Sequence, residues 1–363
     1  MIYLDYQSTT PLAPEARAAM LPWLEGAANP HSSHKAGRIA AAEIGIARER
    51  VAALLPPDGK VYFTSGATEA LNWAITSAAA SGGGIVTLGT EHAAVLDTLA
   101  SRAALNTVLV VPVRADGLVD LDAARAAIKP GVSLVCAMHV NNEIGVIQPI
   151  TELAGMAHAV GARLLCDAVQ GFGREPLPEG CDYIAITAHK IYGPIGVGAL
   201  WVASGAPLSA MLHGGGQEGG LRSGTLSPAL CGGFGAAAKL MLDQREADAA
   251  HVVMLASQLR AALGADWIVN GSTDQRYAGN LNVRRDGLDA ARLISDVREV
   301  AFSAGSACAS GSGRTSHVLR ALGLSTAQAR SSIRLGFGRY TTAEDIAEAA
   351  ALISAAADQQ RII

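Results

Sequence analysis

The chain has 363 residues, a hydrophobic fraction of 50% and a formal net charge of −4 at pH 7. Its length predicts one large domain and a smaller one. The weakly negative charge, without a dense run of Lys and Arg, argues against nucleic acid as a partner. No basic start precedes a long apolar run, and no segment has the apolar length of a membrane span, so we expect a cytoplasmic protein that does not bind a membrane.

The first half of the chain alternates between short apolar runs and Ala-rich helical patterns. The runs expected to be strands are KVYFTSG, GGIVTLG, TVLVVPV, VSLVCAMHV, ARLLCDAV, YIAITAHK and VGALWV, between about residues 60 and 205. Helical spacing is found in TEALNWAITSAAA, HAAVLDTLASRAAL and LAGMAHAVGA. Such alternation predicts a mostly parallel sheet that is covered by helices.

The second half begins with the glycine-dense segment HGGGQEGGLRSGTLSP, which we expect to be a loop. A long helical pattern follows at about residues 229–263 and is expected to bridge two domains. Short strand-like and helical runs then mix, as in a small α+β domain. We therefore predict an α/β protein with a large domain at residues 16–250 and a small domain formed by residues 1–15 and 251–363.

Five cysteines are present, at positions 136, 166, 181, 231 and 308. Their odd number and the absence of a C-x-x-C pair argue against a zinc site and a closed disulfide framework, and we expect no metal. Cys136 and Cys166 lie in apolar runs, where a thiol is most often a small buried hydrophobe. Cys308 differs, because it lies in SAGSACASGSG, whose small residues pack no core and favour no regular element.

In three segments, polar residues stand at or directly after the end of an expected strand. FTSGATEA follows a strand and opens a helix, so its backbone N–H groups and the Thr68 hydroxyl can bind an anion, although a simple helix cap is the commoner outcome. Asp167 ends the strand in LLCDAVQG, where a carboxylate needs a partner: a cationic ring nitrogen, an arginine or an Asx-turn.

Lys190 in TAHKIYGPIGVG follows the next strand and precedes a Gly/Pro loop. A lone lysine is normally a solvated charge, but burial lowers the pKa of a lysine and enables its amine to form a Schiff base. An anion site, a strand-end carboxylate and a loop lysine are together what pyridoxal 5'-phosphate requires.

The chain resembles the cysteine desulfurases, which are fold-type I pyridoxal-phosphate enzymes, over nearly its whole length. The matching segments are YLDYQSTTP, NPHSSH, FTSGATEALN, TEHAAVLDT, MHVNNEIGVIQPI, CDAVQG, AHKIYGP, HGGGQEGGLRSGT, SAGSACAS, SHVLRALG and SSIRLGFGR. The resemblance implies a fold-type I transferase with a large domain, built on a mostly parallel sheet, and a small α+β domain.

The resemblance also implies roles around the cofactor ring. Lys190 holds the cofactor as a Schiff base and later moves the substrate Cα proton. Asp167 pairs with the pyridine nitrogen, Gln170 hydrogen-bonds the phenolic oxygen, and His92 stacks over the ring and assists proton transfer. Without the resemblance, His92 would be interpreted as a surface or helix-start residue.

Further matched positions concern the phosphate and the substrate. The expected phosphate and cofactor contacts are Ala67, Thr68, Asn142, Thr187 and His189. Thr225 matches a threonine that is supplied to the neighbouring subunit's phosphate, which implies a homodimer. Asn142 and Arg334 are expected to bind the substrate carboxylate, a task suited to the planar fork of arginine. The alternative for Arg334 is an ordinary surface ion pair.

The resemblance gives Cys308 a function. It implies that L-cysteine is converted to L-alanine and that the sulfur passes to Cys308 as a persulfide. An acceptor protein, such as an iron–sulfur scaffold or a thiolation enzyme, then takes the sulfur. Gly and Ser around Cys308 suit a mobile tether, and the thiolate is the attacking species.

Some positions depart from the family's usual pattern. Gln7-Ser8 replaces Asn-Ala or Ser-Ala, Ile195 replaces a lysine, Gly219 an arginine and Thr187 a serine. We expect changes in local charge at the dimer or cofactor rim, with the core chemistry retained. The chain also ends at QQRII, where housekeeping relatives continue with a tail that helps to dock a scaffold, so the acceptor stays open.

The alternatives to a cysteine desulfurase are three. A selenocysteine lyase uses the same cofactor and depends less on the loop cysteine. A catalytically weak sulfur-relay protein would keep the fold without turnover. An aminotransferase would leave the small-residue loop around Cys308 without a purpose.

Overall fold

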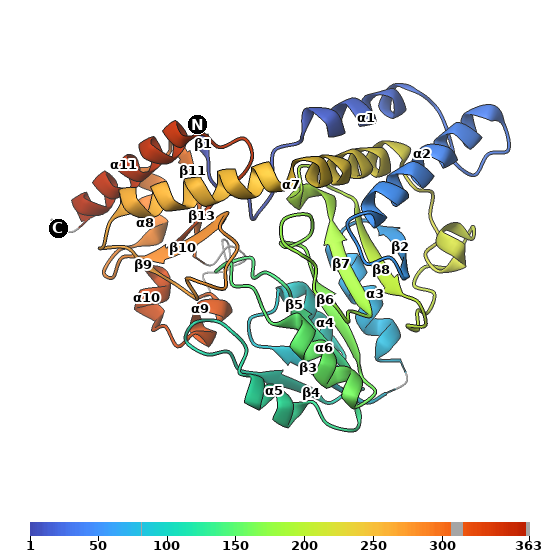
Figure 1. Ribbon diagram of the computed structural model, residues 1–363, viewed down its shortest axis with the longest axis horizontal. Helices are drawn as coiled ribbons and strands as arrows, with labels where there is room; N and C mark the ends of the chain where they lie inside the picture. Colours follow the sequence, from blue (N-terminus) through green and yellow to red (C-terminus); the bar gives the residue numbers. More distant parts are fainter. Residues whose placement is uncertain (81, 306–314, 361–363) are drawn as a thin grey trace.

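A computed structural model describes residues 1–80, 82–305 and 315–360 (Figure 1). Cys308 lies outside the described residues. In the part of the chain that is described, no helix combines the length and apolarity needed to cross a membrane. The cellular location expected from the sequence stays a prediction.

A seven-stranded sheet forms the centre of the larger part of the described chain. Its strands, in spatial order, are β2 (Gly59–Thr64), β8 (Gly198–Ala203), β7 (Tyr183–Thr187), β6 (Arg163–Asp167), β5 (Val132–Met138), β3 (Gly84–Leu88) and β4 (Val108–Val111). All neighbouring strands are parallel except β8, which is antiparallel to both β2 and β7. The predicted mostly parallel sheet is therefore confirmed.

Both faces of this sheet are buried, as its near-continuous apolar strands predict. In β5, Leu134 and Cys136 pack on the face covered by α3 (Ala67–Ala78) and α4 (Ala93–Ser101). Val135 and Ala137 point to the other face, which is covered by the helices α2 (Lys35–Ala52), α6 (Ile150–Ala159) and α7 (Pro228–Leu263). The helix α1 (Pro14–Glu25) packs on α7, and α5 (Leu121–Ala127) follows β4.

The helix α7 joins two hydrophobic cores. Its N-cap is Ser227, whose Oγ accepts a hydrogen bond from Leu230 N at 3.3 Å, and Gly264 ends it with a φ of 79°. Phe234 in its first half belongs to the core of the large sheet, whereas Leu255 in its second half belongs to a separate core. Figure 1 shows the helix running between these two parts. The helix predicted at about residues 229–263 is confirmed.

The second core surrounds a smaller, antiparallel sheet. Its strands are β12 (Ser303–Ala304), β13 (Ser332–Gly336), β10 (Asn280–Arg284) and β9 (Ile268–Val269). The helices α8 (Ala290–Asp296) and α11 (Ala343–Gln360) pack there, and the short helices α9 (His317–Ala321) and α10 (Thr326–Arg330) precede β13. The chain start joins this part, since β1 (Ile2–Tyr3) pairs with β11 (Val300–Ala301) and Leu4 is buried in the second core. The domain boundaries given above stay a prediction.

Candidate active site

A cavity of about 450 Å³ lies at the carboxyl ends of β5, β6 and β7. This is the edge at which open parallel sheets bind ligands. Ten of the expected site residues line it: Ala67, Thr68, His92, Asn142, Asp167, Gln170, Thr187, His189, Lys190 and Arg334. Residues from the central sheet and from the smaller sheet therefore meet at one cavity.

Asp167 is a buried carboxyl group at the end of β6. It is 4% exposed, and its Oδ1 accepts a hydrogen bond from Val169 N at 3.0 Å. Burial raises the pKa of Asp167, although the nearby charges of His92 and Lys190 act in the opposite direction. The carboxylate is therefore costly as it stands and would be stabilised by a further cationic partner in the cavity.

This environment predicts the pH dependence of stability in ligand-free protein. Because the pKa of Asp167 is higher in the folded than in the unfolded state, the folded state binds the proton more tightly. The free energy of unfolding therefore falls as the pH rises from the pKa of the unfolded state to that of the folded state. Asp167→Asn should raise that free energy by about 1–3 kcal/mol at mildly alkaline pH and by less at mildly acidic pH. Thermal unfolding of both proteins at the two pH values measures this; a gap that is equal at both, or reversed, would contradict it.

Glu91 is a second buried acid beside Asp167, and the sequence analysis missed it although it precedes His92 directly. It is 0% exposed, and its Oε1 accepts a hydrogen bond from Met138 N at 2.7 Å. Burial, followed by the negative charge of Asp167, raises the pKa of Glu91 well above its ordinary value. Burial therefore favours the neutral form of Glu91, and the negative charge of Asp167 adds to this preference.

Lys190 lies on a single 3₁₀ turn, Ala188–Lys190, that follows β7. Its Nζ donates hydrogen bonds to the main-chain oxygens of Gln7 and Ser8, each at 2.5 Å. The neighbouring His189 has its pKa lowered to about 4, by burial first and then by the positive charges of Lys190 and Arg174. His189 is therefore a neutral imidazole at neutral pH, able to hydrogen-bond without adding charge.

The start of α3 forms the anion-binding end of the cavity. Gly66 precedes the helix, and Ala67 and Thr68 begin it, so unpaired backbone N–H groups and the positive end of the helix dipole face this end. Gly198 of β8 packs directly against it: a Cβ there would lie 2.7 Å from the carbonyl carbon of Gly66. The absence of a side chain at this position lets the sheet approach the helix start closely.

Arg334 on β13 is held at the other end of the cavity. It is 1% exposed, which excludes the ordinary surface ion pair considered as an alternative. Its Nη2 donates to Asp5 Oδ1 at 2.7 Å and to Ser8 Oγ at 2.9 Å, and its Nη1 donates to the main-chain oxygen of Asn142 at 2.9 Å. The guanidinium is thus fixed in one orientation, and it brings a buried positive charge to the cavity wall.

His92 combines a structural and a site position. It is the N-cap of α4, where its Nδ1 accepts a hydrogen bond from Ala94 N at 3.0 Å, and its side chain lines the cavity. The helix-start interpretation from the sequence alone is confirmed. The hydrogen bond also orients the imidazole ring next to Asp167, whose pKa responds to the charge of His92.

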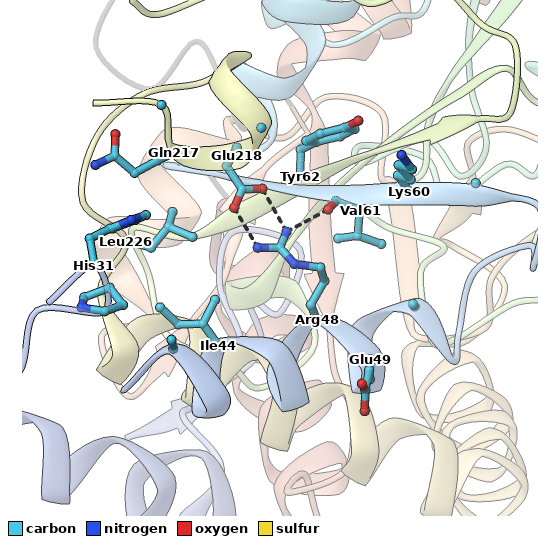
Figure 2. Close-up of a pocket in the computed structure, with 16 residues that line it drawn as sticks. His31, Ile44, Arg48, Glu49, Lys60, Val61, Tyr62, Gln217, Glu218 and Leu226 are labelled. Atoms are coloured by element: carbon cyan, nitrogen blue, oxygen red, sulfur yellow. Dashed lines mark hydrogen bonds and ion pairs between the residues drawn. The ribbon is translucent and has the colours of Figure 1, made fainter. Parts of the chain in front are cut away.

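Thr225 is not in this cavity. It is exposed and lies in the glycine-dense segment, directly before Leu226, which lines a second cavity of about 650 Å³ (Figure 2). In that cavity Arg48 Nη2 lies 2.6 Å from Glu218 Oε1, and Glu218 Oε2 accepts from Phe63 N at 3.0 Å. Gly219, at one of the departures from the family pattern, lines the same cavity and has a φ of 69°.

A second ion pair holds the glycine-dense segment close to the cavity that contains Lys190 and Asp167. Arg222 Nε donates to Glu69 Oε1 at 2.7 Å, and Glu69 Oε2 accepts from Ser65 N at 2.8 Å. Glu69 lies in the first turn of α3, so the chain just before Thr225 is tied to the anion-binding end. Thr225, three residues after Arg222, is exposed.

The four described cysteines are poor nucleophiles. Cys136, Cys166, Cys181 and Cys231 are all buried and unpaired by disulfides. Burial raises the pKa of Cys136 well above its ordinary value and that of Cys231 to about 12, while a hydrogen bond with Cys181 and burial raise that of Cys166. Because the thiolate is the reactive form, a reactive cysteine has to be sought at Cys308, outside the described residues.

Comparisons with known proteins give similarities over nearly the whole chain. Residues 2–348 match the family model described as Aminotransferase class-V. Cysteine desulfurase IscS of Rickettsia bellii (strain OSU 85-389) is 40% identical over 368 residues, which cover 97% of this chain and 90% of the relative. A solved structure titled NifS-like protein has a TM-score of 0.90 at 28% identity and covers 100% of both chains. Another, titled SspA in complex with cysteine, has a TM-score of 0.84 at 31% identity and covers 94% of this chain and all of that one.

Proposed function

The chain belongs to the cysteine desulfurases of the class-V aminotransferase family, and we propose that it converts L-cysteine to L-alanine with bound pyridoxal 5'-phosphate and delivers the sulfur to an acceptor protein. It is an enzyme of the fold-type I class expected from the sequence, since its fold matches the NifS-like protein. The observation that carries the proposal is the meeting of Lys190, Asp167 and the start of α3 at one cavity.

The residues present fit this cofactor. Asp167 is a buried carboxylate that lacks sufficient cationic compensation, as its raised pKa indicates, and a protonated pyridine nitrogen would supply it. The backbone N–H groups at the start of α3, with Thr68 and Thr187, suit a phosphate. Bound pyridoxal 5'-phosphate supplies an electron sink for the carbanion formed at the substrate Cα.

Lys190 has two tasks in this proposal. It attaches the cofactor through Nζ, and after the substrate amine displaces it, the free amine moves the proton at the substrate Cα. The main-chain oxygens of Gln7 and Ser8 accept hydrogen bonds from Nζ and thereby hold the released amine near the cavity. His92 takes part in the same proton transfer, and its position as the cap of α4 at the cavity wall supports this role.

Arg334 and Asn142 are the residues proposed to bind the substrate carboxylate. Arg334→Lys should raise the KM for L-cysteine by about 10- to 100-fold with a smaller change in kcat, because an ammonium cannot reproduce the two parallel hydrogen bonds of a guanidinium. Steady-state kinetics measure both constants. Arg284→Lys on β10 is the matched control, since Arg284 pairs with Asp286 instead; an equal KM increase in both variants would contradict the assignment.

Cys308 is the residue proposed to take the sulfur. Its thiolate attacks the substrate sulfur and forms an S–S bond, while the bond between substrate Cβ and sulfur breaks and leaves its electron pair on carbon. Protonation of that carbon gives alanine, and the persulfide passes to an acceptor. The acceptor in this proposal is an iron–sulfur scaffold or a thiolation enzyme.

We also propose a homodimer in which Thr225 completes the phosphate site of the partner subunit. Its exposed position, three residues after the Arg222 that pairs with Glu69 of α3, supports this arrangement. An exposed apolar side chain supports it too, since Ile195 lines the cavity and is 71% exposed.

A subunit-mixing experiment tests the dimer. Lys190→Ala and Thr225→Asp subunits should each be nearly inactive alone, the second because its carboxylate repels the phosphate. After random reassortment, each mixed dimer would hold one intact site, so about one quarter of the wild-type activity should return. No recovery in dimers shown by mass spectrometry to be mixed would contradict the exchange of Thr225.

Product analysis tests the proposed activity itself. Protein reconstituted with pyridoxal 5'-phosphate and given L-cysteine and a reductant should form alanine and sulfide in equal amounts over many turnovers. Formation of a keto acid from the substrate with amino-group transfer would instead identify an aminotransferase, and a strong preference for L-selenocysteine would identify a lyase. A visible cofactor band without turnover would favour the catalytically weak sulfur-relay protein.

A further inference from the structure

We propose that Arg174 is a positioning residue that fixes the side-chain amide of Gln170, so that the amide nitrogen is presented as a donor to the cofactor. The inference rests on the proposed function, because Gln170 is the residue expected to hydrogen-bond the phenolic oxygen of the cofactor. Arg174 lies four residues beyond Gln170 and carries no motif that assigns it a role.

The contacts of Gln170 allow only one orientation of its amide. Gln170 is 3% exposed; its Oε1 accepts a hydrogen bond from Arg174 Nη1 at 3.2 Å, and its Nε2 donates to the main-chain oxygen of Gln7 at 2.9 Å. A guanidinium can only donate and a carbonyl oxygen can only accept. Turning the amide over would therefore place donor against donor and acceptor against acceptor, at a buried position where such mismatches are costly.

Arg174 is itself held in place by two further groups. Its Nη2 donates to the main-chain oxygen of Lys190, and its guanidinium carbon lies 5.2 Å from the centroid of the Tyr277 ring. Tyr277 is 8% exposed and belongs to the second core. A planar guanidinium can donate to Gln170 Oε1 and to the main-chain oxygen of Lys190 while it stacks on the Tyr277 ring. An ammonium cannot make these three contacts together. Arg174 thus joins the segments that follow β6 and β7 on the cofactor side of the sheet.

The fixed amide has a consequence for proton affinity at Lys190. Gln170 lines the cavity together with Lys190, and its Nε2 carries a second hydrogen besides the one that Gln7 receives. If Lys190 Nζ lost its proton in the cofactor-bound enzyme, the negative charge on the phenolic oxygen of the cofactor would no longer have a positive charge beside it. A donated N–H stabilises that charge and lowers the pKa of the proton, whereas a carbonyl oxygen turned toward it would raise this pKa.

The test is the pH titration of the visible absorbance band of the holoenzyme, reconstituted with pyridoxal 5'-phosphate. Arg174→Met should raise the pKa of the spectral transition by about 0.5 to 1, and Gln170→Leu should raise it by a similar amount. The double variant should show no further increase beyond Gln170→Leu, because Arg174 acts through Gln170. Arg174→Lys, which keeps one donor, should show a smaller increase than Arg174→Met.

Arg245→Met is the control for the simple loss of a nearby positive charge. Arg245 and Arg174 both line a third cavity, of about 60 Å³, and Arg245 does not line the active-site cavity. The transition of this variant should match that of the wild type. An unchanged transition in Arg174→Met, or an Arg174→Met increase of the same size in the Gln170→Leu background, would overturn the inference while leaving the proposed function intact. If the wild type forms no visible band with pyridoxal 5'-phosphate, the proposed function fails, and this inference fails with it.

Discussion

Replacing Lys190 by alanine is expected to lower the rate of alanine formation from L-cysteine by about 10⁴-fold or more. The amine at this position attaches the cofactor and then moves the Cα proton, and within the described residues lining the cavity it is the one lysine side chain. Lys190→Arg should lose a similar amount, because a guanidinium keeps the charge but forms no Schiff base and gives up no proton at neutral pH. Alanine formation and the visible cofactor band are measured together.

The control for this experiment is Lys129→Ala, at an exposed position after α5. It should retain wild-type rate and spectrum. Circular dichroism should show that Lys190→Ala remains folded, so that the loss of turnover reports the missing amine. Turnover of Lys190→Ala near the wild-type rate would exclude Lys190 as the cofactor-attachment site and would require another amine.

The second large effect is expected at Cys308. Cys308→Ala should lower multiple-turnover alanine release by about 10²-fold or more while the visible band of bound cofactor persists. The remaining cysteines cannot replace it, because they are buried, and the raised pKa values of Cys136, Cys166 and Cys231 keep those thiols protonated at neutral pH.

Cys231→Ala serves as the matched control. Cys231 lies in the first turn of α7 and is 1% exposed, so its replacement changes a buried contact without touching the cavity. It should retain most of the alanine release. Equal release by Cys308→Ala and wild type would show that another nucleophile or direct elimination takes the sulfur, and a selenocysteine-lyase type of reaction would become the better account.

Much of the fold could be predicted from apolar patterning. The runs around Val135 and Leu165 are apolar on both faces, which is characteristic of parallel strands buried between helices, and both lie in the central sheet. The antiparallel direction of β8 was not predicted. It has a physical signal in hindsight: β7 ends at Thr187 and β8 begins at Gly198, a connection too short for the crossover that a parallel strand requires.

The site could be predicted where side chains follow strands directly. Asp167 and Lys190 follow neighbouring strands, so the rule that ligands bind at the carboxyl edge brings them together. The pairing of Asp5 with Arg334 could not be predicted in this way, because the two are 329 residues apart and the contact depends on the bridge between Asp5 and Gly336 at the end of β13.

Main-chain atoms are the other part of the site that the sequence does not reveal. The hydrogen-bond acceptors for Lys190 Nζ are the carbonyl oxygens of Gln7 and Ser8, and any residue type supplies such an oxygen. Arg174 is hidden for a related reason, since one of its fork contacts is to the main-chain oxygen of Lys190. The partners of the Lys190 and Arg174 side chains therefore become known only when the fold places the neighbouring segments.

The most direct test of the account is to locate the sulfur after a single turnover. Holoenzyme is given L-cysteine without reductant, the free thiols and persulfides are trapped with an alkylating reagent, and the peptides are analysed by mass spectrometry. The account predicts one additional sulfur atom on the peptide containing Cys308, together with one alanine per subunit, and none on the peptides containing the four buried cysteines. Alanine formation with the additional sulfur on another cysteine, or on none, would contradict it.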